Sequence, residues 1–313
     1  MIEHGLVCLL RNNKCGGYKT LLASKNPSLE KIREVYFHNL QTLQKIIDFC
    51  IENNIHTHRV SSSLFPLLTY EPYRNKLLPL LEEALKNNPI DRKGISLTMH
   101  PDQFILLSSN NPNVNEKSRY ELDITSYISN YIPIDLINIH VGSANQGKDI
   151  HKKIFKTEFS LLNKQTKKLL SLENDEKSYN FNDVLEISLE NGCMMVPDFH
   201  HERCYQKRNT ENPYSTPYLW NNHIDENIFN NFDKVLSTYR NVKPTFHLSS
   251  PIHGWTNSFK ENCSHSDFID IQDYPYNLIA LTNNIVVRMD IEAKAKDEAV
   301  LLLESQLKLN KLD

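Results

Sequence analysis

The chain has 313 residues, of which 40% are hydrophobic, and a formal charge of −3. This length and apolar content allow one large folded domain, and we expect no membrane span because no apolar stretch approaches the length that a bilayer requires. The first residues do not follow the order of a secretory signal. The six cysteines show no CxxC pair, so we expect reduced thiols and a cytoplasmic or nucleoid-associated protein.

Short apolar runs alternate with amphipathic stretches along the sequence. The runs predict strands over residues 5–10, 56–62, 95–100, 136–142, 169–174, 193–201, 244–250 and 284–294. The amphipathic stretches predict helices over 27–52, 73–87, 115–130, 150–164, 181–191, 226–239 and 294–309, with a long loop over 202–222. Strands that are apolar throughout and separated by helices indicate a parallel sheet covered on both faces.

Eight strands of this kind predict an α/β fold of the TIM (α/β)8 barrel class, built as a single domain over residues 1–313. An open doubly wound sheet is the alternative fold. It usually has fewer strands and binds its ligand at one switch point, whereas the polar strand ends of this chain are spread over every late strand.

The last six apolar runs each end in a residue that can bind a metal ion. These residues are His100, His140, Glu173, Asp198, His247 and Glu292. A parallel barrel brings all its strand ends to one rim, and imidazole together with carboxylate suits zinc or manganese. A single histidine at a strand end is most often structural, but six such ends in succession predict a multi-metal hydrolytic site.

The chemistry of these groups suggests how the ions would be divided. Glu173 is the candidate bridge, because one carboxylate can bind two ions and paired ions suit phosphoester hydrolysis. His100 and His140 would hold one ion, and Asp198, His247 and Glu292 a second. His201 lies three residues after Asp198, so the PDFHH segment could serve two ions from one strand end, and His265 with Asp267 could complete a third site.

Other candidate sites in the sequence are weaker. His56 and His58 lie on one side of a strand, but the neighbouring Arg59 favours local hydrogen bonding. Cys204 follows His201 closely, yet a Cys-His nucleophile needs an orienting third residue that the sequence does not show. Phosphate-binding GxGxxG and Walker motifs and the GxSxG elbow are absent from the sequence.

The slightly acidic charge alone argues against a polyanionic partner. If Glu173, Asp198 and Glu292 face metal ions, however, the remaining acidic and basic residues are equal in number. Two long insertions, 201–218 and 251–266, would leave the rim, where loops determine substrate choice. Basic residues predicted to contact phosphates from rim loops are Arg11, Lys14, Lys148, Lys207 and Arg208.

A series of motifs runs in order from about residue 56 to 300: RVSSSLFP (59–66), HPDQF (100–104), NIHVGSANQGK (138–148), SLEND (171–175), PDFHHE (197–202), FHLSSP (246–251), HSDFI (265–269) and IEAKAKDEA (291–299). Together these motifs resemble the UV damage endonuclease family, which is similar in fold and metal site to endonuclease IV.

The resemblance implies an endonuclease that cuts damaged double-stranded DNA immediately 5′ of a lesion and leaves a 3′-hydroxyl and a 5′-phosphate. It also implies three metal ions, with manganese favoured and zinc as the alternative. The sequence itself gives no sign of an obligate protein partner. Glu173, His100 and His140 would be catalytic, and Gln103 and Phe104 would probe the distorted DNA. The implied ligands are His100, His140, Glu173, Asp198, His201, His247, His265 and Glu292.

Five places in the sequence depart from the family pattern, and one of them is Ser62-Ser63, which stands where serine-aspartate is often found in the second strand. Phe104 stands where a tyrosine is usual, Leu6 where the first strand often carries a probing tyrosine, Tyr70 where a histidine sometimes follows the second strand, and Thr245 where a lysine precedes the seventh-strand histidine. These departures affect the lesion-reading surface more than the metal site.

Three other functions fit parts of the same pattern. The first is an abasic-site endonuclease on the same scaffold, and the second is a metal-dependent sugar isomerase, which needs neither a third ion nor a DNA groove. The third is a metal-loaded DNA-binding protein without turnover, against which the complete ligand set argues. Gln103 and Phe104 could also have a purely structural role, in which Gln103 caps its loop and Phe104 packs beneath it.

Overall fold

The computed structural model describes residues 1–74 and 76–309. Eight parallel strands lie at its centre in the order β6-β5-β4-β3-β2-β1-β8-β7. They are β1 (Ile2–Val7), β2 (Thr57–Ser61), β3 (Ser96–His100), β4 (Leu136–His140), β5 (Leu170–Glu173), β6 (Met194–Val196), β7 (Thr245–Leu248) and β8 (Val287–Ile291).

The two edges of this sheet meet at the point where β6 ends. Asp198 forms a parallel bridge with His247 of β7, and the His247 N–H donates to the Pro197 carbonyl at 2.9 Å. The strands therefore form a nearly closed barrel, which confirms the predicted TIM (α/β)8 class and excludes the open doubly wound sheet.

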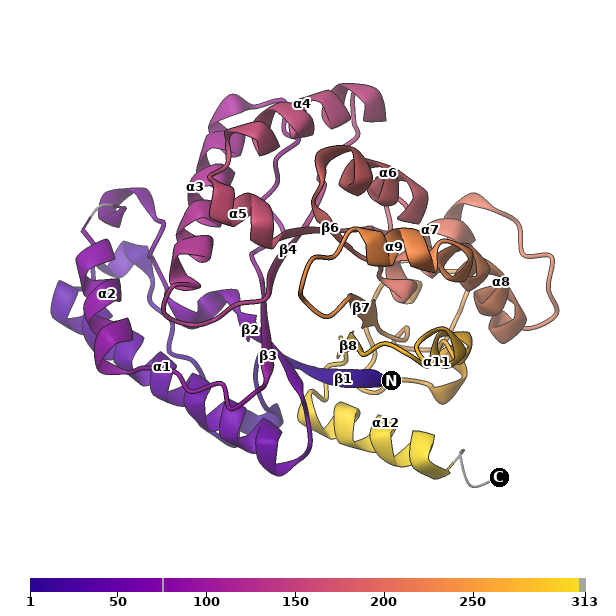
Figure 1. Cartoon of the computed structure of the whole chain (residues 1–313), viewed down its shortest axis with the longest axis horizontal. Helices are drawn as coiled ribbons and strands as arrows, with labels where there is room; N and C mark the ends of the chain where they lie inside the picture. The colour runs from indigo at the N-terminus through magenta and orange to yellow at the C-terminus, as the bar shows by residue number, and fades with distance from the viewer. Residues whose placement is uncertain (75, 310–313) are drawn as a thin grey trace.

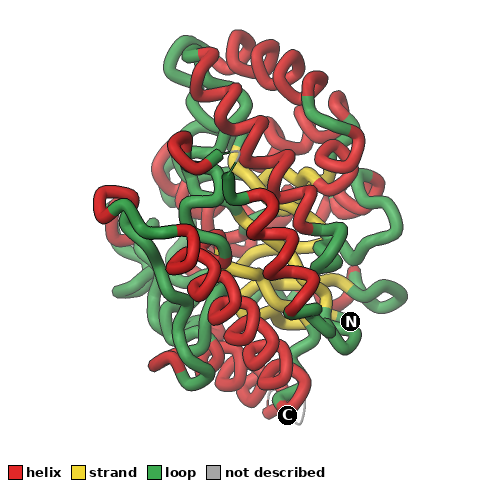
Figure 2. Tube along the Cα trace, turned by 90° about the vertical axis from the view of Figure 1, so that its left-hand side faces the viewer, coloured by secondary structure: helices red, strands yellow, loops and turns green. Residues whose placement is uncertain are grey.

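Helices surround the strands, as Figures 1 and 2 show from two directions. They are α1 (Leu29–Glu52), α2 (Leu78–Asn87), α3 (Pro112–Ile128), α4 (Lys148–Leu161), α5 (Lys164–Leu169), α6 (Phe181–Asn191), α7 (Phe199–Asn209), α8 (Pro217–Asn230), α9 (Phe232–Ser237), α10 (Phe259–Asn262), α11 (Asn277–Leu281) and α12 (Asp297–Leu309). In the described part of the chain, no helix combines the length and apolar character needed to cross a bilayer.

Helix α1 illustrates how the sequence builds this layer. The Ser28 side chain caps its first turn by accepting the Lys31 N–H. Apolar residues then recur at helical spacing, and Ile32, Leu40 and Leu43 are fully buried in the core. The helix accordingly begins and ends close to its predicted bounds.

Side chains alternate between the two faces of each strand. In β3, β4 and β5 one set, which joins the apolar core, comprises Leu97, Met99, Ile137, Ile139 and Leu172. Toward the ends of these strands the other set is buried but polar, at Thr98, Asn138 and Ser171. His100, His140 and Glu173 continue the polar set by two residues each. They therefore point to the inside of the barrel, at its carboxyl-terminal rim.

The predicted loop over 202–222 is wrong for most of its length, because α7 and the start of α8 leave only residues 210–216 between helices. The sequence of α7, FHHERCYQKRN, has no apolar stripe because its buried face is ionic. Arg203 is 1% exposed and forms a two-pronged ion pair with Asp225 of α8 at 3.0 and 2.6 Å. Hydrophobic periodicity cannot reveal a helix that is buried through a salt bridge.

Several predicted bounds are also corrected. The sixth strand, predicted to reach residue 201, ends at Val196, because Asp198 caps α7 by accepting the His201 N–H at 2.7 Å. The first strand covers Ile2–Val7 in place of 5–10. The helix predicted over 73–87 covers Leu78–Asn87, and residue 75 lies outside the described residues. The helix predicted over 226–239 is divided between α8 and α9.

Candidate metal centre

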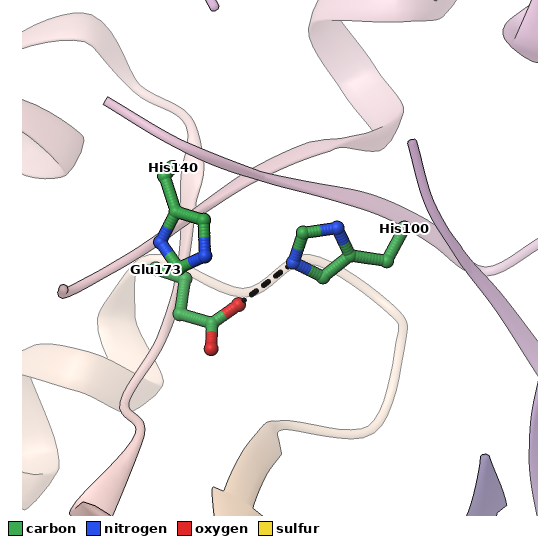
Figure 3. Close-up of side chains that lie close together, drawn as sticks. All are labelled: His100, His140 and Glu173. Carbon is green, nitrogen blue, oxygen red and sulfur yellow. Dashed lines mark hydrogen bonds and ion pairs between the residues drawn. The ribbon is translucent and has the colours of Figure 1, made fainter. Parts of the chain in front are cut away.

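Three side chains meet where β3, β4 and β5 end. His100, His140 and Glu173 each offer a ligand atom, and these atoms all lie within 4.8 Å of one another (Figure 3). His100 Nε2 is 3.1 Å from Glu173 Oε2, while its Nδ1 contacts the Pro101 carbonyl oxygen at 2.9 Å. The backbone contact orients the His100 ring so that Nε2 faces the cluster.

A second cluster shares Glu173 with the first. It comprises Glu173, Asp198, His247 and Glu292, again with ligand atoms within 4.8 Å of one another. Glu173 Oε1 is 3.0 Å from His247 Nδ1, whereas Oε2 faces His100. The two oxygens of one carboxylate thus face two different clusters, which is the geometry that a bridging ligand needs.

The residues of both clusters suit divalent cations. Asp198 Oδ2 and His140 Nδ1 are buried and have no hydrogen-bond partner among the described residues. Buried polar atoms are normally paired, so an unpaired carboxylate oxygen of Asp198 within a ligand cluster is consistent with a place for a cation. Mixed imidazole and carboxylate donors match manganese or zinc.

His201 and His265 lie beside these clusters. His201 Nε2 is 3.7 Å from Glu173 Oε1 and its Nδ1 is 3.0 Å from Glu176, while His265 Nδ1 is 3.8 Å from Glu292. Within the described ranges, His201, His265 and Asp267 do not form a third cluster as tight as the other two. The third ion therefore stays a prediction.

We expect His201→Ala and His265→Ala each to reduce the occupancy of one ion more than that of the others, because both side chains lie at the edges of the two clusters. Anomalous scattering at the manganese edge, measured on manganese-soaked crystals of each variant, would give the occupancies. Three fully occupied ions in either variant would contradict the assignment of that histidine, and only two ions in the parent protein would contradict the third site.

Charge is distributed unevenly in the centre. Burial opposes ionisation of Glu173, but its interactions with His247, His140 and His100 outweigh burial and hold the pKa of Glu173 well below its usual value. Burial likewise opposes a charged His247, yet Glu173 raises the pKa of His247 well above its usual value. At His140 burial prevails and lowers the pKa. Glu173 is therefore kept as an anion in a fully buried place.

Four further residues hold the ligands in place and were not predicted. Asn138 donates to Glu173 Oε2, and Ser171 donates to Asn138 Oδ1 at 3.0 Å. Arg59 donates to Glu292, and Glu176 contacts His201. The spacing of Asn138 and Ser171, each two residues before a candidate ligand, is the signal that would have revealed them.

The centre opens into a cleft of about 430 Å³, which Gln103 and Phe104 line together with Arg59. Five of the candidate ligands also line it: His100, His140, Glu173, His201 and Glu292. Phe104 is 65% exposed, so it does not pack beneath its loop. Asp102, which precedes the pair, accepts a hydrogen bond from Ser62 Oγ at 2.8 Å and ties the loop to the end of β2. Gln103 and Phe104 are therefore accessible to a molecule that enters the cleft.

The weaker candidate His58 and the residues that depart from the family pattern lie outside the two ligand clusters. His58 is buried with Nδ1 3.0 Å from the Leu6 carbonyl oxygen. Leu6 is fully buried, so it cannot replace an exposed probing residue. Thr245 is buried in β7, and Tyr70 is half-exposed.

Most of the predicted phosphate-contacting residues are already paired. Arg11 binds Glu298 at 2.6 Å, Lys14 binds Asp297 at 2.9 Å and Lys148 binds Asp183 at 2.5 Å. Lys207 and Arg208 lie on α7 and not in a loop. Lys207 Nζ is 4.0 and 4.6 Å from the ring centroids of Trp220 and Trp255, whereas Arg208 is exposed and contacts Phe259.

Comparison with known proteins agrees with this architecture. A UV DNA damage endonuclease of Nostoc sp. strain PCC 7120 is 31% identical over 220 residues, which cover 65% of this chain and 66% of that protein. The crystal structure of SacUVDE superposes with a TM-score of 0.74 and 25% identity over 99% of both chains. Endonuclease IV from Thermus thermophilus shares the fold, with a TM-score of 0.56 and 12% identity over 98% of this chain and 99% of that one.

The match also extends to a whole family. The family model for UV-endonuclease UvdE matches residues 11–313, which is nearly the entire sequence. Its extent includes every strand end that contributes to the two clusters. The chain belongs to the UV-endonuclease UvdE family.

Proposed function

We propose that this protein is a metal-dependent DNA repair endonuclease that hydrolyses the phosphodiester immediately 5′ of UV photoproducts in double-stranded DNA. One observation carries the proposal. Glu173 presents one carboxylate oxygen to each of two ligand clusters, and the centre opens into the cleft that Gln103 and Phe104 line. Family membership supports DNA as the substrate class, and we propose that residues 1–313 act as one domain.

The proposed ions, three in number, would be manganese, with zinc as the alternative. The residues that would hold them are His100, His140, Glu173, Asp198, His201, His247, His265 and Glu292. When bound, such ions lower the pKa of water and offset the charge of a leaving oxygen. Asn138 and Arg59 hold the carboxylates of Glu173 and Glu292 in position.

The chain's own part in reading DNA falls to the loop after β3. Damaged pairs stack less well, so their bases leave the helix at lower cost. The Gln103 amide would fill the gap that remains, and the exposed Phe104 ring would stack on a base. Both lie beside the ligands in one cleft, so a lesion held there would place its 5′ phosphodiester at the centre.

A substrate panel tests this proposal against its alternatives. The protein in Mn²⁺ would be incubated with labelled duplexes carrying a thymine dimer, an abasic site or no lesion, and separately with a ketose sugar. We expect cutting of the dimer duplex. Cutting of the abasic duplex alone would replace the proposal with an abasic-site nuclease, and turnover of the sugar alone would indicate an isomerase.

DNA binding is expected to weaken as salt rises, because phosphate contacts release counterions. Arg208→Ala should lower the slope of log affinity against log salt by about one unit, since each lost phosphate contact removes about that much. Arg11→Ala is the matched control, because its guanidinium is already bound to Glu298. Titration of a lesion duplex at several salt concentrations gives both slopes, and a flat dependence in the parent would contradict phosphate contacts altogether.

A further inference from the structure

The two ring nitrogens of His247 face different surroundings. Nδ1 is 3.0 Å from Glu173 Oε1 and 3.2 Å from Glu292 Oε1, so it faces the ligand cluster. Nε2 faces away from that cluster and is 3.6 Å from Asp290 Oδ2. An imidazole that binds a cation through one nitrogen carries its proton on the other. With a cation on Nδ1, the His247 proton would therefore lie on Nε2, the nitrogen that faces Asp290.

Asp290 is a buried carboxylate that the rest of the fold leaves unsatisfied. It is 0% exposed, and neither of its oxygens has a hydrogen-bond partner among the residues the structure describes. The charges of Arg59 and Arg288 act on it, but the hydrogen bonds of Arg59 go to Glu292, and those of Arg288 to Asp135 and the Lys243 carbonyl. Burying a carboxylate that has no partner destabilises a fold, so we infer that Asp290 has a partner.

The neighbouring strand β1 leaves space for the Asp290 carboxylate. Gly5 of β1 lies opposite Asp290 of β8 in the parallel register. A Cβ atom at position 5 would overlap Asp290 Oδ1 and the Thr57 side chain. Glycine at this position thus supplies the space in which the Asp290 carboxylate reaches toward His247.

We propose that Asp290 is a positioning residue that accepts the Nε2–H of His247, and so holds His247 Nδ1 toward the second cluster. The inference rests on the metal centre of the proposed function. The present 3.6 Å separation is longer than a hydrogen bond, so the proposal requires it to shorten when Nδ1 binds a cation. Partners of this kind fix the tautomer and orientation of metal-binding histidines.

Manganese affinity, measured by calorimetry on the full chain with Mn²⁺ alone, tests the proposal. Asp290→Val should weaken binding by about 10- to 100-fold, and Asp290→Asn, which keeps an acceptor oxygen, should recover most of that loss. Gly5→Ala should also weaken binding although every ligand is intact. Thr98→Val, which removes another buried and unpaired side-chain oxygen from the barrel interior, should leave affinity unchanged.

Stability separates positioning from general damage to the fold. Replacing a buried unpaired charge by an apolar side chain is often neutral or stabilising, so metal-free Asp290→Val should unfold at or above the temperature of the parent while its Mn²⁺ affinity falls. Equal affinity of Asp290→Val and the parent would overturn the proposal. A parent chain that binds no Mn²⁺ would instead overturn the metal centre of the proposed function.

A second measurement uses the parent protein, so it does not depend on the folding of any variant. In ¹⁵N-histidine-labelled protein loaded with Zn²⁺, the His247 ring should show a metal-bound Nδ1 and an exchange-protected proton on Nε2. A metal-bound Nε2 with the proton on Nδ1 would overturn the proposal, whatever the variants show.

Discussion

Glu173→Gln should reduce cleavage of a lesion duplex by roughly two orders of magnitude or more, because even the outer partners of metal ligands commonly contribute 10- to 100-fold. Glu173 is shared by both clusters, so its loss affects both groups of ligands at once. Its anionic state, stabilised by His247 and His140 against the cost of burial, would disappear with the amide. Cleavage rate and bound metal would be measured on the same samples.

A matched variant separates this effect from the loss of any buried carboxylate. Glu202 is 1% exposed on α7, and its carboxylate accepts the Phe181 N–H at 2.7 Å, away from both clusters. Glu202→Gln should therefore keep parental cleavage and metal content. Parental turnover in Glu173→Gln would remove Glu173 from the mechanism, whatever the control shows.

Gln103→Ala and Phe104→Ala should both reduce cutting of a thymine-dimer duplex while leaving metal binding unchanged. Stacking of one aromatic ring on a base is worth roughly 1–3 kcal/mol, so we expect losses of about 10- to 100-fold for Phe104→Ala. Neither side chain belongs to the two ligand clusters, although both line the same cleft.

The same variants locate lesion reading when a second substrate is added. Kinetics on a duplex with an abasic site would show whether the loss is confined to the dimer, which would place photoproduct recognition in this loop. Asn113→Ala, an exposed change at the start of α3, serves as the control and should behave as the parent. If Gln103→Ala cuts both duplexes at parental rates, the probing role is wrong.

Much of the centre could be predicted because barrel geometry converts sequence position into spatial position. Each candidate ligand follows an apolar run, and parallel strands bring these ends to one rim. His100, His140 and Glu173 lie together for this reason, although they are far apart in sequence. Glu173 was predicted to bridge two ions because one carboxylate can bind both, and its two oxygens do face the two clusters.

The residues that support the ligands were harder to predict. Asp290 lies in a strand that reads as apolar, and only its spacing of two residues from Glu292 shows that it faces the barrel interior. The role of Arg59 depends on contact with Glu292 of β8, which the linear sequence does not reveal. Helix α7 was missed for a related reason, since its burial depends on the ion pair between Arg203 and Asp225.

The position and chemistry of the cut on one DNA strand test the central claim most directly. A duplex with a single thymine dimer, labelled at either end of the damaged strand, would be incubated with the protein in Mn²⁺. The products would then be sized and tested with ligase and phosphatase. The account predicts a break immediately 5′ of the dimer, with a 3′-hydroxyl and a 5′-phosphate. A break on the 3′ side of the dimer, or an intact strand under conditions where the protein binds Mn²⁺, would contradict it.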